Sequence, residues 1–242
     1  MINLKKKDIQ IINEMFPIDL LFANNLNWFA LIDPGIDQKV NKLTCKKKEV
    51  SLFENLDDKE YELSPKIVQL SHDYSDWDIF NNDFDKAAVS IILTHLNLKE
   101  VSIFLKNLTM PIFESGIDSF FAFWDPVVLS ALVGNEYDRT NYYHGCIFND
   151  EQKNLFLNPF VTWCYWDRIN QLQFILEESK SVDITEKLII SEKQEELILL
   201  ATLPDTIIYY LNLNNKFLLE SFESKIEIYD FVCECILLFE KL

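Results

Sequence analysis

The sequence predicts an α/β (α+β) fold, with a mixed-sheet N-terminal lobe and flanking helices followed by a small all-helical lobe. Up to about residue 178, runs of β-branched and aromatic residues alternate with segments of helical spacing. Beyond that point only helical patterns occur. A chain of 242 residues, 49% of them hydrophobic, is long enough for one main domain and an appendage. We therefore predict two units, residues 1–178 and 179–242.

The first part of the chain supplies one helix and several strands. Apolar residues recur at helical spacing over 5–16, which predicts a short amphipathic helix. Trp28–Ile32 predicts a buried strand that ends in an Asp33-Pro turn, where Gly35 is available for a positive φ. The segments "EVSLFENL" and "PKIVQLS" predict short strands separated by a charged turn, "DDKEYE". The run "AAVSIILTH" predicts a further strand.

The middle of the chain predicts two helices. In "LNLKEVSIFLKNLTM" the apolar residues fall at i, i+3, i+4 and i+7, as on one face of a helix. Residues 118–134, "DSFFAFWDPVVLSALVG", predict an aromatic strand, a tight junction and a helix. Asp125 can cap this helix, Pro126 suits its first position, and Gly134 suits its end.

The last part of the chain combines strands with the helical lobe. Between 135 and 176 we predict two or three strands, the last pair forming a hairpin that turns near Arg168. A capping box beginning at Ser191 opens a helix that Pro204 is expected to stop. "DTIIYYLNL" predicts another short helix, and the spacing over Ile226–Phe239 predicts a final one.

The charge balance is strongly acidic. The formal net charge is −17, from 39 acidic and 22 basic residues, and only Arg139 and Arg168 are arginines. Nucleic-acid binding depends on basic residues that displace counterions from phosphates, so we predict no nucleic-acid partner. An acidic surface is typical of a merely soluble protein, or of one that attracts a basic protein partner.

The cysteines and the N-terminus predict a cytoplasmic protein. The five cysteines include no C-x-x-C pair, and full pairing would leave one over, which favours free thiols in a reducing compartment. The N-terminal segment lacks an uninterrupted apolar run and a small-residue cleavage site. An unbroken window of about 18 apolar residues is absent, so we predict no membrane partner.

The sequence carries no recognisable catalytic or cofactor motif. Its four glycines form neither a phosphate-binding loop nor a nucleophile elbow. Cys233 and Cys235 would lie on nearly opposite faces of a helix. His144 and Cys146 would share a strand face but supply only two metal ligands. We therefore predict no catalytic residue, cofactor or metal site.

Asp33 and Asp125 admit two interpretations. Each follows a predicted strand at an Asp-Pro junction, so we favour a role for each in capping its own turn or helix. Two such carboxylates within about 10 Å of each other in one cleft would instead predict a hydrolase.

The strand "VTWCYW" also admits two interpretations. Trp163 and Trp166 belong to an aromatic cluster that alternates in strand fashion, so one face is expected in the core. The opposite face would form an exposed patch if its rings anchored a partner. Core packing is the favoured interpretation.

The order of these motifs resembles that of the bacterial type VI secretion adaptor, or effector-chaperone, family. The family begins with a strand of the form "ALLD", matched by "FALID" at 29–33, then "SLF" at 51–53 and a strand matched by "PKIVQL". Its signature "FRFYDPRVL" is matched by "FAFWDPVVL" at 121–129. "HGCIF" is similar to a later "fGP"-like step, and Gln194 in "SEKQEEL" resembles the entry to the family's helical lobe.

The chain also departs from the family pattern. Ala122 and Val127 stand at the positions of the two signature arginines, so interactions made by those guanidinium groups are absent. "HGC" replaces "GP", and the helical lobe is brief.

The resemblance implies a non-enzymatic adaptor that binds a segment of an effector toxin and loads it onto the C-terminal region of a VgrG-type spike protein. The expected partner-binding residues are Asp33, Phe53, Trp124, Asp125, Trp163 and Trp166. Two other functions stay open: an acidic cytoplasmic immunity protein that inhibits a toxin, and the hydrolase based on Asp33 and Asp125.

Overall fold

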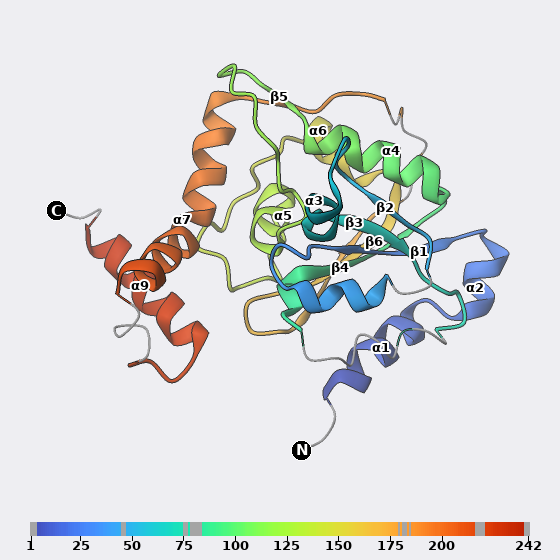
Figure 1. The fold of residues 1–242 in the computed structure, drawn as a ribbon, viewed down its shortest axis with the longest axis horizontal. Helices are drawn as coiled ribbons and strands as arrows, with labels where there is room; N and C mark the ends of the chain where they lie inside the picture. Colours follow the sequence, from blue (N-terminus) through green and yellow to red (C-terminus); the bar gives the residue numbers. More distant parts are fainter. Residues whose placement is uncertain are drawn as a thin grey trace.

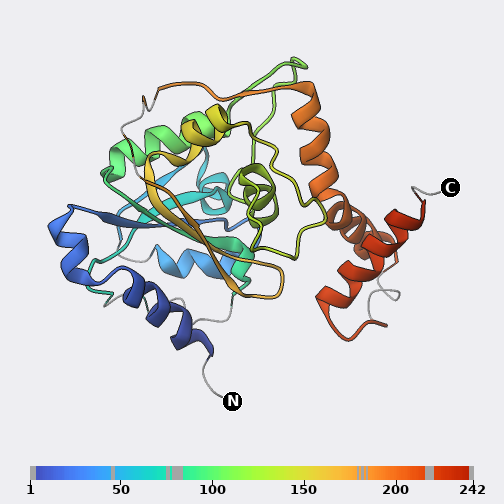
Figure 2. The same ribbon diagram turned by 180° about the vertical axis from the view of Figure 1, so that it is seen from behind.

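The fold is mixed α/β, with helices on both faces of a central sheet and a helical C-terminal region (Figure 1). The computed structural model describes residues 4–44, 47–74, 77, 84–178, 180, 183, 185–215 and 221–239. The predicted fold class is thus confirmed, and the C-terminal helices lie beside the main lobe in both views (Figures 1 and 2).

The central sheet has six strands in the order β2-β3-β1-β4-β6-β7. Its strands are β1 (Asn27–Ile32), β2 (Glu49–Ser51), β3 (Lys66–Gln69), β4 (Val89–Thr94), β6 (Phe160–Trp166) and β7 (Leu172–Leu176). All neighbouring strands run antiparallel, whereas the sequence predicts a mixed sheet. The parallel pairing found in the described part of the chain joins the two-residue strands β5 (Ile112–Phe113) and β8 (Ile189–Ile190). Because β8 lies in the region predicted to be all-helical, this pairing ties that region to the N-terminal lobe.

The helices cover both faces of the sheet. They are α1 (Leu4–Met15), α2 (Ile18–Ala23), α3 (Asp58–Leu63), α4 (Leu98–Thr109), α5 (Pro126–Val133), α6 (Asp150–Leu157), α7 (Glu192–Asn214) and α9 (Lys225–Phe239), with 3₁₀ helices η1 (Gln38–Leu43) and η3 (Lys86–Ala88). Figures 1 and 2 place α4 and α6 on one side of the sheet and α1 on the other.

Two buried clusters fill the space between the sheet and its helices. Alternate residues of β1 divide between them: Phe29 and Leu31 join the cluster under α4, α5 and α6, whereas Trp28 and Ile32 join the cluster under α1 and η1. The central strands β1 and β4 are therefore buried on both faces. This double burial explains why they appear as continuous apolar runs in the sequence.

Local signals predict several elements correctly. Asp125 caps α5, Pro126 occupies its first turn, and Gly134 ends it with a φ of 65°. The hairpin between β6 and β7 turns at residues 167–171, close to the predicted position. The capping box at Ser191 and the final helix are also confirmed.

Other predicted elements are wrong, for identifiable physical reasons. The aromatic segment before Asp125 forms no strand: Phe121 and Phe123 point into the core, but no neighbouring strand pairs with them among the described residues. The predicted turn "DDKEYE" belongs to α3, because Asp57 and Glu60 form a capping box. Gly35 has no positive φ, and its N–H donates to the Asp33 side chain instead.

Two further corrections concern helices. The region 135–176 holds two strands, β6 and β7, within the predicted two or three, but it also holds the unpredicted α6, which a capping box between Asn149 and Gln152 starts. Helix α7 continues through Pro204 to Asn214, so the two predicted helices there are one. A proline inside a helix removes one backbone hydrogen bond, but contacts outside the helix can offset that loss.

Candidate partner-binding site

Asp33, Phe53 and Trp124 meet beside the end of β1 although they are far apart in the sequence. Trp124 Nε1 donates a hydrogen bond to Asp33 Oδ2 at 2.7 Å. The Phe53 ring lies 6.2 Å from the Trp124 ring and 4.5 Å from that of Phe120, measured between centroids. Phe120 is 63% exposed, so these rings, which we call the aromatic cluster (Phe53, Phe120 and Trp124), reach the surface.

Asp125 lies next to this cluster but serves α5. Its Oδ1 accepts a hydrogen bond from the Val127 N–H at 2.8 Å, as expected of an N-cap. Burial raises the pKa of the Asp125 carboxyl, and the nearby Asp205 charge adds to that rise. Asp33 and Asp125 thus each hold a structural hydrogen bond, which agrees with the capping interpretation.

The raised pKa of Asp125 predicts a pH-dependent stability difference. An acid with a higher pKa in the folded state binds protons more tightly there, so its contribution to stability falls as pH rises from 3.8 towards the folded value. Asp125→Asn keeps a good cap and removes this titration. We expect the free energy of unfolding of the wild type, relative to this variant, to decrease across that window. Urea denaturation at several pH values measures it.

The matched control is Asp57→Asn, the same change at the exposed N-cap of α3. Subtracting the change that Asp57→Asn causes in the free energy of unfolding removes the general effect of an Asp-to-Asn substitution at an N-cap. A difference between wild type and Asp125→Asn that stays constant over the pH series would contradict the prediction.

Arg168 forms a polar junction between the main lobe and the C-terminal helices. Its Nη1 donates to Thr140 O at 2.8 Å and to Asn141 Oδ1 at 2.9 Å, both in the main lobe. Its Nε and Nη2 donate to the two carboxylate oxygens of Asp205, in α7. The guanidinium carbon lies 4.0 Å from the centroid of the Tyr229 ring, in α9. We call these five residues the Arg168 junction.

The electrostatics of the junction keep Arg168 charged. Burial alone would lower the pKa of its guanidinium, but the hydrogen bonds and charge of Asp205 outweigh burial and raise that pKa. The Arg168 side chain is 13% exposed and that of Asp205 44%. Bidentate Arg–carboxylate pairs of this kind fix the relative orientation of the two side chains in addition to pairing their charges. Sequence reasoning missed the junction, although Arg168 stands out as one of only two arginines.

Trp163 and Trp166 do not form an exposed patch. They are 0% and 2% exposed and belong to the two different buried clusters. Trp163 Nε1 donates to Ser90 Oγ, and Trp166 Nε1 donates to Asp8 Oδ2, each at 2.9 Å. The favoured core interpretation is confirmed, and neither ring is available to a partner in this structure.

The C-terminal helices expose a set of large apolar side chains that the sequence reasoning did not single out. We call it the helical-lobe surface; each member is at least 44% exposed, and they are Leu199, Tyr209, Tyr210, Leu213, Phe231, Leu237, Leu238 and Phe239. Figures 1 and 2 show α9 and the end of α7 standing away from the sheet. The signal available in the sequence is the density of apolar residues in α7 and α9 on all sides, rather than in one stripe.

Helix α7 is also long and apolar enough to cross a membrane, by length and composition. Its most apolar 18-residue window has a mean hydropathy of 1.2, and 11% of that window is buried. No unbroken apolar run produces this value, because Pro204 and Asp205 interrupt the middle of the helix. Asp205 is ion-paired with Arg168 of the main lobe, which holds that part of α7 against the folded protein.

The structure does not place the residues considered for metal binding as predicted. His144 and Cys146 lie in a loop rather than on a strand, and Cys146 Sγ contacts the carbonyl oxygens of Leu132 and Phe148. Within the described ranges, no group of three or more His, Cys, Asp or Glu side chains is placed to hold a metal ion.

Comparison with known proteins found no relative of the chain. No protein-family model matches the chain, and neither a curated protein nor a solved structure matches it. The resemblance to type VI secretion adaptors therefore rests on the short motifs alone.

Proposed function

We propose that the chain is a cytoplasmic, non-enzymatic adaptor of the type VI secretion effector-chaperone kind. In this role it binds a segment of an effector toxin and carries it to the C-terminal region of a VgrG-type spike protein. The helical-lobe surface is the observation that carries the proposal. Many exposed large apolar side chains in one region of a protein are typical of a site of protein interaction.

The chemistry of the helical-lobe surface suits a helical or apolar partner segment. Tyr209, Tyr210 and Phe231 offer aromatic rings, and aromatic side chains are frequent anchors at protein interfaces. The engagement of Asp33 and Asp125 in structural hydrogen bonds supports an adaptor over a hydrolase. An immunity protein would also be acidic, but its acidic surface would cover the catalytic domain of a toxin.

The proposal predicts that charge on the helical-lobe surface weakens partner binding without unfolding the protein. Leu213 and Leu238 are 62% and 64% exposed, so Leu213→Glu and Leu238→Glu are expected to change the free energy of unfolding by less than about 0.5 kcal/mol. The tagged protein is captured from its own host, its partners are identified by mass spectrometry, and pairwise binding is then measured. We expect each variant to weaken binding at least tenfold.

The matched control is Leu176→Glu, a change of the same type at a side chain that is 55% exposed on β7, away from the helical lobe. It should bind like the wild type. Recovery of a spike tail with a non-catalytic toxin segment supports the proposal. Recovery of a toxin bound and inhibited through its catalytic domain favours the immunity function, and unchanged binding by both helical-lobe variants contradicts the proposed surface.

A further inference from the structure

Strand β2 presents unpaired backbone groups along one edge of the sheet. It is the first strand in the sheet order and pairs only with β3 among the described strands. Leu52 N donates to Pro65 O, and Gln69 N donates to Lys48 O. In an antiparallel pair the bonded residues alternate, so the N–H and C=O groups of Glu49 and Ser51 point away from β3. A sheet edge with such outward-pointing groups is a template for another strand. Ser51 is 6% exposed, so the accessible part of this edge is at Glu49 and Val50.

A hollow of about 340 Å³ runs beside this edge. Its walls are β2 itself, Phe53 and Leu56 from the following loop, Tyr61 of α3 and Lys106 of α4. Phe53 contacts the exposed ring of Phe120, so the apolar side of the hollow continues into the aromatic cluster. The hollow therefore combines free backbone hydrogen-bonding groups with an apolar wall.

The other wall of the hollow carries the Glu49 carboxylate, which has one oxygen without a hydrogen bond from the described residues. Glu49 Oε1 accepts a hydrogen bond from the Tyr61 hydroxyl at 2.9 Å, whereas Glu49 Oε2 is buried without a hydrogen-bond partner among the described residues. Lys106 does not neutralise it, because Lys106 Nζ lies 3.1 Å from Glu54. The charge of Lys66 acts on Glu49, but its Nζ donates its hydrogen bond to Asn41 Oδ1, at 3.2 Å. A buried carboxylate oxygen without a hydrogen bond is costly, and a Lys or Arg donor from a binding partner would offset that cost.

We propose that the β2 edge binds an extended, basic segment of a partner protein as an additional strand. The backbone of the segment pairs with that of Glu49, and a Lys or Arg side chain pairs with the Glu49 carboxylate. Successive side chains of a strand point to opposite faces, so the residues beside the cation are apolar and contact Phe53 and Leu56. The net charge of −17 favours the approach of such a segment. This site is separate from the helical-lobe surface and does not depend on it.

The test uses the full-length protein and a phage-displayed library of random nine-residue peptides. We expect the enriched peptides to alternate Lys or Arg with apolar residues and to lack proline in the alternating part. The dissociation constant of one synthesised winner is then measured for three variants. Glu49→Gln removes the charge but keeps an acceptor for Tyr61, and Glu49→Pro also removes an N–H that points away from β3. Both are expected to weaken binding at least tenfold.

The third variant, Leu176→Glu, is the control and should bind the peptide like the wild type, because Leu176 is an exposed residue of β7 at the opposite end of the sheet. Circular dichroism spectra establish that each variant is folded. The proposal is overturned if no peptide is enriched, if the enriched peptides carry no basic residue, or if folded Glu49→Gln binds them as tightly as the wild type. Loss of peptide binding in Leu176→Glu would also overturn it, because the peptide would then occupy the opposite edge of the sheet, at β7.

Discussion

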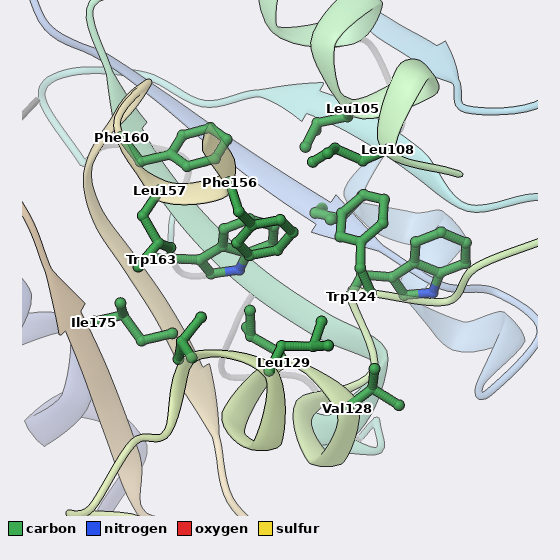
Figure 3. Close-up of a cluster of buried hydrophobic side chains, with 14 of the residues drawn as sticks. Leu105, Leu108, Trp124, Val128, Leu129, Phe156, Leu157, Phe160, Trp163 and Ile175 are labelled. Carbon is green, nitrogen blue, oxygen red and sulfur yellow. The ribbon is translucent and has the colours of Figure 1, made fainter. Parts of the chain in front are cut away.

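Replacement of Trp163 by alanine is expected to lower the free energy of unfolding by about 3–5 kcal/mol, the usual cost of removing a large aromatic side chain from a core. The side chain is fully buried. Its ring stacks on Phe156 with centroids 5.5 Å apart, and the Phe160 ring meets it edge-on (Figure 3). The Phe123 ring also meets it edge-on. Alanine would leave a cavity at the centre of this group and would also remove the hydrogen bond to Ser90 Oγ.

The measurement is urea denaturation, with Trp163→Phe as the matched variant. Phenylalanine keeps an aromatic ring in the same space but leaves the buried Ser90 hydroxyl without its donor, so the expected loss is smaller, about 1–3 kcal/mol. Tyr137→Ala, at a side chain that is 76% exposed, should change stability by less than about 0.5 kcal/mol. A loss below about 1 kcal/mol for Trp163→Ala would contradict the buried position of this ring.

The parts of the fold that the sequence predicted depend on neighbouring residues. The Asp125 cap, Pro126 in the first turn and Gly134 at the end specify α5 within a single stretch of chain. The segment with Phe121 and Phe123 shows the limit of such reasoning. It alternates as a strand does, but a strand also needs a hydrogen-bonding neighbour, and that condition depends on residues far away in the sequence.

The candidate site was harder to predict, because it is formed by contacts between residues far apart in the sequence. The hydrogen bond between Asp33 and Trp124 joins residues 91 positions apart, and neither residue alone indicates it. Burial of Trp163 and Trp166 follows from how helices cover both faces of the sheet, which strand alternation cannot reveal. The end of α7 was misplaced because Pro204 is a strong local signal against a helix, and contacts such as the one between Arg168 and Asp205 were not visible.

Replacement of Arg168 by alanine is expected to lower the free energy of unfolding by about 2–4 kcal/mol. Breaking a buried ion pair costs roughly 3–5 kcal/mol, and the partial exposure of Asp205 reduces that cost because water can solvate its carboxylate. Thr140 O and Asn141 Oδ1 would also lose their donor. Urea denaturation gives the loss, and hydrogen exchange locates it.

The Arg168 junction joins three separate segments, so its loss should have a directional effect. Helix α9 contacts the main lobe through Tyr229 on Arg168 and through the largely exposed Lys225–Asp85 pair. Helix α7 contacts the main lobe at Asp205 and also near its start, where Gln194 donates a hydrogen bond to Ile147 O. We therefore expect Arg168→Ala to increase the amide exchange rate, relative to the wild type, more in α9 than in β1 and β4. The hydrogen bonds of these two strands do not involve the junction. Arg168→Lys keeps the positive charge but cannot form the bidentate pair, so it should recover only part of the stability that Arg168→Ala loses. Uniform acceleration of exchange across the sheet and both helices would mean that Arg168 supports the whole fold rather than the attachment of the helical lobe.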